Sequence, residues 1–197
     1  MSGARPLARG PTQLNMTPQH ALELTDADSA QAIHNLWPLY LHDLDAYAPK
    51  PLNAHGVISE DDEVRSWAEL SAGNAAWWKN PGVLFPYLIR AGGRPAGFAL
   101  VASGAYLPSP DLDWCMHEFF IAHWARGTGV GVAAAREAIA RHRGRWEVVT
   151  YPGQERPIRF WRKALAACAA AVEETEEDHP FGRKVVFRLD NGGGEAG

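Results

Sequence analysis

A glycine-rich segment in the second half of the chain has residue types and spacing suited to binding an anion. Arg126 is followed by glycines at positions 127, 129 and 131, between an apolar run that ends at Ile121 and an alanine-rich run that ends at Arg141. The two runs are typical of a strand and a helix, so the glycines lie where the helix begins. At a helix start the backbone N–H groups lack partners and the helix dipole is positive. The segment therefore predicts an anion-binding site.

Two nucleotide-binding motifs with this outline do not fit the segment. The Walker pattern needs Gly-Lys-Ser/Thr, which does not occur here. The dinucleotide fingerprint G-x-G-x-x-G fits Gly127 and Gly129 but meets Val132 at its third glycine. The pattern that remains is Arg-x-x-Gly-x-Gly, formed by Arg126, Gly129 and Gly131.

This pattern, with the strand residue Ile121 five positions before it, resembles the coenzyme A motif of the GCN5-related N-acetyltransferases, the GNAT family. In that family the backbone amides of the turn hold the coenzyme A pyrophosphate, and the end of the preceding strand pairs with the pantetheine arm. The resemblance implies acetyl-CoA as the acetyl donor and places Ile121 and His123 beside the pantetheine. The residues it assigns to the pyrophosphate are Arg126, Gly127, Thr128, Gly129, Val130 and Gly131.

The segment after Tyr151 shows a second, partial resemblance to the same family. Residues 154–163 resemble its Asn-x-x-Ala-x-x-Phe-Tyr helix, with Gln154 in the Asn position, Pro157 in the Ala position and Trp161 in the Tyr position. Gln154 and Trp161 thereby join the expected coenzyme A contacts. The family's usual general acid is that tyrosine, whereas an indole N–H cannot deliver a proton. Tyr151 is the candidate replacement, unless the thiolate leaves with hydrogen-bond help alone. A non-catalytic acyl-CoA-binding sensor of the same fold is the alternative function.

Acetyl transfer to an amine also requires a general base. A lysine-like amine with a pKa near 10.4 is neutral in roughly one molecule in 2,500 at pH 7, so a base must remove its proton. His117 and Glu118 are the candidates. Strict alternation puts His117 on the face of Ile121, where several relatives carry their base, whereas a bulge would reverse the facing and favour Glu118. Glu118 is slightly preferred, because an unpartnered carboxylate inside an apolar strand is costly.

The acceptor amine is expected between the first helix and the fourth and fifth strands. In the resembling family the first helix and its following loop form part of the acceptor wall. The corresponding residues here are Trp37, Tyr40, Asp43 and Tyr47. Acidic and aromatic side chains suit a cationic amine, but this complementarity is generic, and small-molecule and protein amines both stay open. Direct attack is favoured because it brings donor and acceptor together in one complex. A covalent route through Cys115 is the dissenting alternative.

The remaining segments predict an α/β fold, with a mixed, twisted β-sheet flanked by helices. The predicted strands are 20–24, 83–90, 95–103, 112–121, 146–151 and 184–189, with a hairpin turn at 91–94. The predicted helices are one over 30–44 capped by Thr25 or Asp26, and others over 59–70, 132–141 and 154–163. The acidic run 173–178 is expected to be a solvated turn. This order resembles the GNAT fold and predicts a single domain over 19–190, between a flexible arm at 1–18 and a flexible tail at 191–197.

Composition and charge argue against several other classes of protein. The 197 residues suit one domain, and a formal net charge of −4 gives no general attraction to nucleic acid or acidic membranes. Two cysteines, Cys115 and Cys168, are too few for a disulfide framework and suit a reducing compartment. No secretory signal and no apolar run of spanning length is present, so a cytoplasmic location is expected. No metal is expected. The sequence is compatible with a homodimer.

Overall fold

The computed structural model describes residues 20–180 and 182–193. Its strands are β1 (His20–Leu24), β2 (Leu84–Ala91), β3 (Arg94–Ala102), β4 (Trp114–Ile121), β5 (Arg145–Thr150), β6 (Val172–His179) and β7 (Gly182–Asp190). Its α-helices are α1 (Gln31–Asp45), α2 (Trp67–Ala72), α3 (Ala76–Lys79), α4 (Val130–Arg141) and α5 (Glu155–Leu165). The predicted arm at 1–18 and residues 194–197 of the predicted tail lie outside the described residues.

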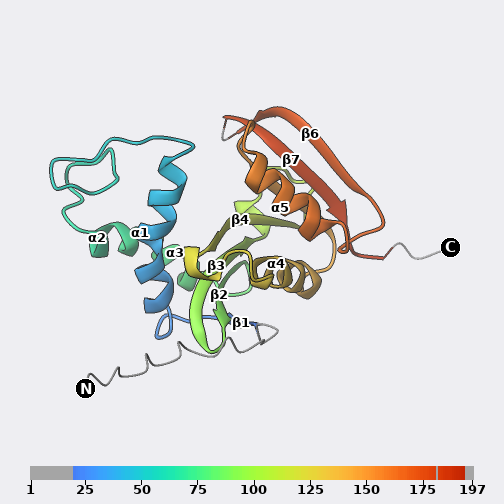
Figure 1. The fold of residues 1–197 in the computed structure, drawn as a ribbon, viewed down its shortest axis with the longest axis horizontal. Helices are drawn as coiled ribbons and strands as arrows, with labels where there is room; N and C mark the ends of the chain where they lie inside the picture. The colour runs from blue at the N-terminus through green and yellow to red at the C-terminus, as the bar shows by residue number, and fades with distance from the viewer. Residues whose placement is uncertain (1–19, 181, 194–197) are drawn as a thin grey trace, which may run out of the picture.

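Within the described residues the strands form one mixed sheet, in the order β1-β2-β3-β4-β5-β7-β6. Neighbouring strands are antiparallel except β4 and β5, which run parallel. Helices α1 to α3 gather on one side of the molecule, and α4 and α5 lie on the other (Figure 1). The predicted α/β class, with a mixed sheet flanked by helices, is confirmed.

Each face of the sheet has its own apolar core, since strand side chains alternate between the faces. The core beneath α1 includes Ile33, Leu36, Leu88, Phe98, Leu100 and Phe120. The core beneath α4 and α5 includes Val101, Ala134, Ala138, Trp146, Leu165 and Phe187. Burial of these side chains holds the helices on the sheet. No helix in the part of the chain described here is both long and apolar enough to cross a membrane.

The strand pair β3 and β4 contains two local features that shape the site. At Gly97 a Cβ would lie 2.0 Å from the carbonyl oxygen of Phe120, so only glycine permits this close approach of the strands. Further along, Leu100 pairs with Glu118 while Val101 pairs with Met116, so His117 is an extra residue in β4. A bulge was one of the two alternatives considered for this strand, but it precedes Glu118 and reverses the facing of Cys115 and Met116 instead. Glu118 stays on the face opposite Ile121, as strict alternation predicts, so the expected reversal does not occur.

The parallel pair β4 and β5 is held together at one end only. Their register begins at Trp114 and Trp146 and ends at Met116 and Val148, although both strands continue. Beyond Met116 the edge of β4 that faces β5 is therefore unpaired. The strands open into a gap on the side of the molecule where α4 begins.

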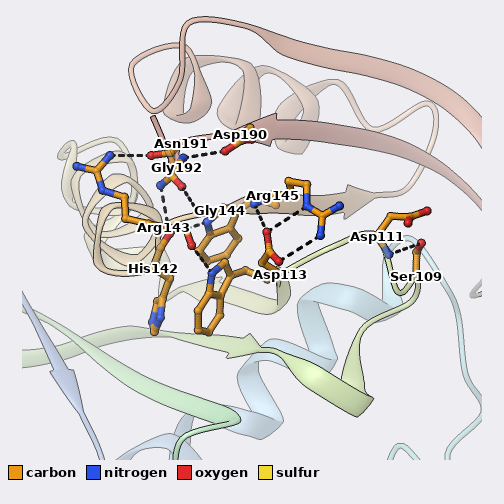
Figure 2. Close-up of polar contacts among 12 residues, drawn as sticks. Ser109, Asp111, Asp113, His142, Arg143, Gly144, Arg145, Asp190, Asn191 and Gly192 are labelled. Atoms are coloured by element: carbon orange, nitrogen blue, oxygen red, sulfur yellow. Dashed lines mark hydrogen bonds and ion pairs between the residues drawn. The ribbon is translucent and has the colours of Figure 1, made fainter. Parts of the chain in front are cut away.

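A network of hydrogen bonds fixes the opposite, paired end of these strands (Figure 2). The side chain of Asn191 donates to the carbonyl oxygen of His142 at 3.2 Å and accepts from the N–H of Gly144 at 2.9 Å. The carboxylate of Asp113, just before β4, accepts from the N–H of Arg145 at 2.8 Å and from its guanidinium. The network ties the turn between α4 and β5 to both neighbouring strands. Asn191, predicted to start a flexible tail, is buried within it.

The predicted helix over 59–70 is wrong for most of its length. Helix α2 begins only at Trp67, because Ser66 is extended and its hydroxyl accepts the N–H of Glu69 as an N-cap. The acidic residues before it lie in a loop that the Asn53 amide closes by donating to the carbonyls of Asp61 and Val64. The acids therefore do not form a first helical turn.

The predicted cap of the first helix is also wrong. Asp26 and Ser29 bond to each other in a separate turn, with each backbone N–H donating to the other's side chain at 2.9 Å. Helix α1 starts two residues later, behind Ala30, and no side chain caps it.

The predicted solvated turn at 173–178 is wrong, since this run forms most of β6. Three of its acids form close ion pairs with arginines of α5 and β7. Glu174 pairs with Arg162 at 2.6 Å, Glu176 with Arg183 at 2.9 Å, and Glu177 with Arg188 at 2.5 Å. Cross-strand pairs of opposite charge stabilise a strand that its own sequence disfavours.

Candidate functional site

A cavity of about 850 Å³ occupies the gap between β4 and β5. It reaches from the first turn of α4 to α1 on one side and to β7 on the other, and residues of α5 complete its wall. Figure 1 shows α1 and the β6–β7 hairpin on opposite sides of β4. The volume suits an extended ligand together with a small second one.

The glycine-rich turn forms one end of this cavity. Gly127 and Gly129 have φ angles of +76° and +91°, which favour glycine, and Gly129 is the N-cap of α4. A Cβ on Gly131 would lie 3.1 Å from Ile121 and 3.2 Å from Phe160, so glycine lets the helix start lie close to β4 and α5. No backbone carbonyl of the described residues accepts from the N–H groups of these three glycines. The turn thus presents backbone N–H groups that lack a backbone acceptor, at the positive end of a helix dipole.

Arg126 does not extend its side chain toward the open turn. Its Nε donates to the carbonyl oxygen of Ile121 at 2.7 Å, and its Nη2 pairs with the carboxylate of Asp43 on α1. The guanidinium therefore joins the end of β4 to α1 across the cavity wall. Arg126 also lines the cavity, as do Gly127 and Gly129 after it.

The other residues expected to contact coenzyme A divide into two groups. Ile121, His123 and Trp161 line the cavity, and the Trp161 ring packs edge-on against Phe119 with centroids 5.2 Å apart. Two side chains, those of Thr128 and Val130, are used elsewhere, and Gln154 lies at the start of α5 without a side-chain hydrogen bond to the helix. The Thr128 hydroxyl donates to the carbonyl of Ala125, Val130 is buried in the core, and Gln154 is the N-cap of α5.

Glu118 lines the cavity, and a residue of α1 holds its carboxylate in place. The hydroxyl of Tyr40 donates a hydrogen bond to its carboxylate. Burial, and then the negative charge of Glu118, raise the pKa of the Tyr40 phenol, so Tyr40 stays protonated and keeps donating. Glu118 makes this contact because it lies on the α1 face with Phe120, opposite Ile121, as alternation from Ile121 predicts. The bulge at His117 precedes Glu118 and leaves that relation unchanged.

His117, the other candidate base, lines the cavity beside Glu118. Its Nδ1 is 3.7 Å from the nearer carboxylate oxygen of Glu118, and its ring meets the edge of Trp77 with centroids 5.3 Å apart. The structure thus brings the two candidate bases together.

Tyr151 and Cys115, the other candidate catalytic groups, also line the cavity. Burial, and then the charge of Glu118, raise the pKa of the Tyr151 phenol, which keeps it a proton donor. Burial and then the negative charge of Glu147 raise the pKa of the Cys115 thiol to about 12. A thiol with that pKa is a poor nucleophile at neutral pH, because the thiolate is the reactive form.

Three of the four residues expected in the acceptor wall reach the cavity. Tyr40, Asp43 and Tyr47 line it from α1 and the turn after α1. Trp37 instead packs between the helix and the sheet, with its ring stacked on Phe98 at 5.6 Å and tilted against Tyr40 at 5.2 Å. Trp37 therefore supports Tyr40 from behind.

Several cavity residues were missed by reasoning from the sequence. They are Tyr106, Glu147, Arg156, Lys163, His179 and Lys184. Glu147 carried a signal, since it is a carboxylate in a largely apolar run, as Glu118 is. Lys184 carried none, because its strand also contains Arg183 and Arg188. Arg156 and Lys163 lie in the segment 154–163, at positions that the family's helix pattern does not specify, and Tyr106 and His179 lie in segments without a distinguishing pattern. No three His, Cys, Asp or Glu side chains in the described part of the chain are grouped to hold a metal ion.

Comparison with known proteins gives matches in structure only. No protein-family model matches the sequence, and no curated protein matches it significantly. An acetyltransferase from Thermus thermophilus matches with a TM-score of 0.59 and 13% identity, over 87% of this chain and 96% of that chain. The aminoglycoside acetyltransferase AAC(6')-Ib, in complex with coenzyme A and kanamycin, matches with a TM-score of 0.56 and 16% identity, over 87% and 95%. The ribosomal-protein-S18-alanine N-acetyltransferase from Escherichia coli matches with a TM-score of 0.53 and 12% identity, over 90% and 98%.

These identities are low, and what the matches establish is the fold. They cover at least 95% of each solved chain and at least 87% of this chain. They agree with the motif resemblance of residues 126–131. The chain therefore has the fold of the GNAT acetyltransferases.

Proposed function

We propose that this protein is an acetyl-CoA-dependent N-acetyltransferase that moves the acetyl group directly to an amine. The observation that carries the proposal is the continuity of one cavity. It joins the bare glycine turn at the start of α4 to Glu118, which Tyr40 holds in place. A donor bound at the turn and an acceptor beside α1 would meet at the same point of β4.

The donor would bind mainly through backbone groups. The N–H groups of Gly127, Gly129 and Gly131 are suited to the pyrophosphate of coenzyme A. The edge of β4 that faces the gap beyond Met116 is suited to the amides of the pantetheine arm, which can pair with it as a further strand would. The thioester would then lie in the gap near Glu118.

The transfer itself needs three proton or charge movements. Glu118, directly or through a water molecule, takes a proton from the amine, and the neutral nitrogen attacks the thioester carbonyl. Negative charge that develops on the carbonyl oxygen is stabilised by backbone N–H groups at the unpaired edge of β4. The carbon–sulfur bond then breaks, and the thiolate of coenzyme A receives a proton from Tyr151.

Direct transfer is favoured over a covalent intermediate by the state of Cys115. Its buried thiol has a pKa of about 12, so it would seldom be present as the thiolate that attacks a thioester. Trp161 occupies the position of the family's usual acid, and its indole N–H can donate a hydrogen bond but cannot deliver a proton. Tyr151 lies in the same cavity and carries one.

Two measurements made together test the proposal. Calorimetric titration with coenzyme A should show saturable binding, and acetyl-CoA should release free thiol when amines of one chemical class are added. Binding without thiol release from any amine would favour an acyl-CoA sensor over the enzyme. Absence of binding would contradict the assignment of residues 126–131.

A further inference from the structure

The end of the cavity farthest from α1 contains a buried cation that acetyl transfer does not use. Lys184 is on β7, is 6% exposed and lines the cavity. Its ammonium nitrogen lies 3.5 Å from the centre of the Tyr151 ring. A cation over a tyrosine ring is attracted to it, but the ring supplies no negative charge.

Carboxylates that could neutralise Lys184 are already bound to other groups. Glu177, its partner in the register of β6 and β7, accepts from Arg188 at 2.5 Å and 3.0 Å. Glu147, on the same wall, accepts from Arg188 at 3.0 Å and lies 3.0 Å from the His179 ring nitrogen. Among the described residues no acidic side chain forms an ion pair with Lys184.

The surrounding protein groups therefore do not neutralise the charge of the Lys184 ammonium. Burial lowers the pKa of Lys184 below its usual range, as expected for a charge taken out of water without an anionic partner. A buried ammonium that faces a cavity is stabilised when an anion enters that cavity.

We propose that Lys184 binds a carboxylate of the acceptor, so that the acceptor is an amine that also carries a carboxylate. This inference rests on the proposed acetyl transfer at the same cavity. Tyr151 lies between the two ends of the acceptor site. One face of its ring carries the Lys184 ammonium, and its phenol lies within the electrostatic influence of Glu118. The amine of the acceptor would lie at Glu118 and its carboxylate at Lys184, with the chain between them against the Tyr151 ring.

The charges around Lys184 favour a singly charged anion over a phosphate. Glu147 and Glu177 lie on the same side of the sheet, and Arg188 is shared between them. A group with two negative charges would be repelled by both carboxylates, whereas a carboxylate places one charge beside one cation. The structure thus suits an amino acid or a similar small zwitterion.

The test compares acceptors that differ only in the carboxylate. Unbranched ω-amino acids of increasing length are assayed with acetyl-CoA beside their carboxamides. We expect at least tenfold higher kcat/KM for the carboxylate at the preferred length. Lys184→Met, which keeps the length of the side chain, should reduce that preference to near one by raising KM for the carboxylate alone. Lys184→Arg should retain most of it, and thermal unfolding of each variant checks the fold.

A matched substitution and a binding measurement separate the possible outcomes. Lys163→Met removes another lysine from the same cavity and should leave the carboxylate preference unchanged. If Lys163→Met abolishes it, or if carboxamides react as well as carboxylates in the wild type, the proposal is wrong. If none of the compounds is acetylated, titration of the CoA-loaded protein with the same compounds measures their binding instead. Lys184-dependent binding without thiol release would retain this inference and contradict the acetyltransferase. Turnover without a carboxylate preference would support the acetyltransferase and contradict the role of Lys184.

Discussion

The hydroxyl of Tyr40 on α1 donates a hydrogen bond to the carboxylate of Glu118 on β4, 78 positions along the chain. The contact exists because α1 lies on the sheet with the Tyr40 ring between Trp37, Phe98 and Phe120. Apolar rings fix the phenol, and the phenol fixes the carboxylate. The first helix therefore positions the proposed general base as well as forming part of the acceptor wall.

Tyr40→Phe should lower kcat by about 10- to 100-fold. The ring and its packing remain, but the carboxylate loses a hydrogen bond of the kind that contributes about 1.5–3 kcal/mol when one partner is charged. Because Tyr40 lies at the acceptor side, the Kd for coenzyme A should not change. Steady-state kinetics with calorimetry measures both. A weaker Kd that accounts for the whole loss would show that Tyr40 has only a structural role.

Glu118→Gln should lower kcat by about 100-fold or more, since general base catalysis contributes about 10²–10⁴-fold. His117→Gln should cost less than tenfold, because His117 lies beside the carboxylate and is more exposed. The two variants are matched in position and both retain a polar side chain. A larger loss in the histidine variant would assign the base to His117.

Gly127→Leu should weaken coenzyme A binding at least tenfold. Its backbone has φ +76°, and a side chain there would project into the space over the bare N–H groups. Gly93→Leu is the matched control, since Gly93 has φ +78° in the β2–β3 turn and likewise has no atom within 4 Å of a Cβ. Both variants bear a similar backbone strain of about 1–2 kcal/mol. Equal coenzyme A affinity in the two would contradict the site.

The stability of the protein should depend on pH through His142. Burial, and then the charge of Arg141, lower the pKa of this histidine from 6.5 to about 4, and its ring nitrogen contacts the Tyr87 hydroxyl at 2.8 Å. Between those values the unfolded chain binds the proton and the folded chain does not, so stability is complete above pH 6.5 and falls as the pH drops to 4. The full loss is about 3 kcal/mol.

Urea unfolding between pH 7.5 and 4 measures this dependence, with His142→Gln as the comparison. The variant cannot titrate at this position, so its stability should change less over the same pH range than that of the wild type. Parallel pH profiles for the two proteins would show that His142 is not the group responsible.

The sequence predicted the parts of the fold and site that depend on local patterns. The glycine turn at 126–131 was predictable because closely spaced glycines separate an apolar run from an alanine-rich run. The structure gives Gly127 and Gly129 the positive φ angles that such a turn requires. The β2–β3 hairpin was visible from its Gly-Gly turn. By contrast, the prediction of a turn over β6 is wrong because six consecutive polar residues have no strand signature, and the arginines that pair with three of them come from α5 and β7.

Contacts between distant residues account for the rest of what was missed. Alternation from Ile121 predicts the facing of Glu118 but not that of Cys115 and Met116, because the bulge at His117 is set by the pairing of β3 with β4. The ion pair of Arg126 with Asp43 of α1 joins residues 83 positions apart, so no local pattern indicates it. In the sequence Lys184 resembles an ordinary strand lysine. Its contact with the Tyr151 ring and its place in the cavity wall are evident only in the structure.

A single-turnover experiment tests the central claim most directly. The protein is loaded with acetyl-CoA, and free thiol, acetylated amine and the mass of the protein are followed before and after an accepted amine is added. Direct transfer predicts no thiol before the amine, then thiol and acetylated amine in equal amounts, with the protein mass unchanged throughout. Thiol release before the amine together with an acetylated protein, or no transfer from bound acetyl-CoA to any amine, would contradict the account.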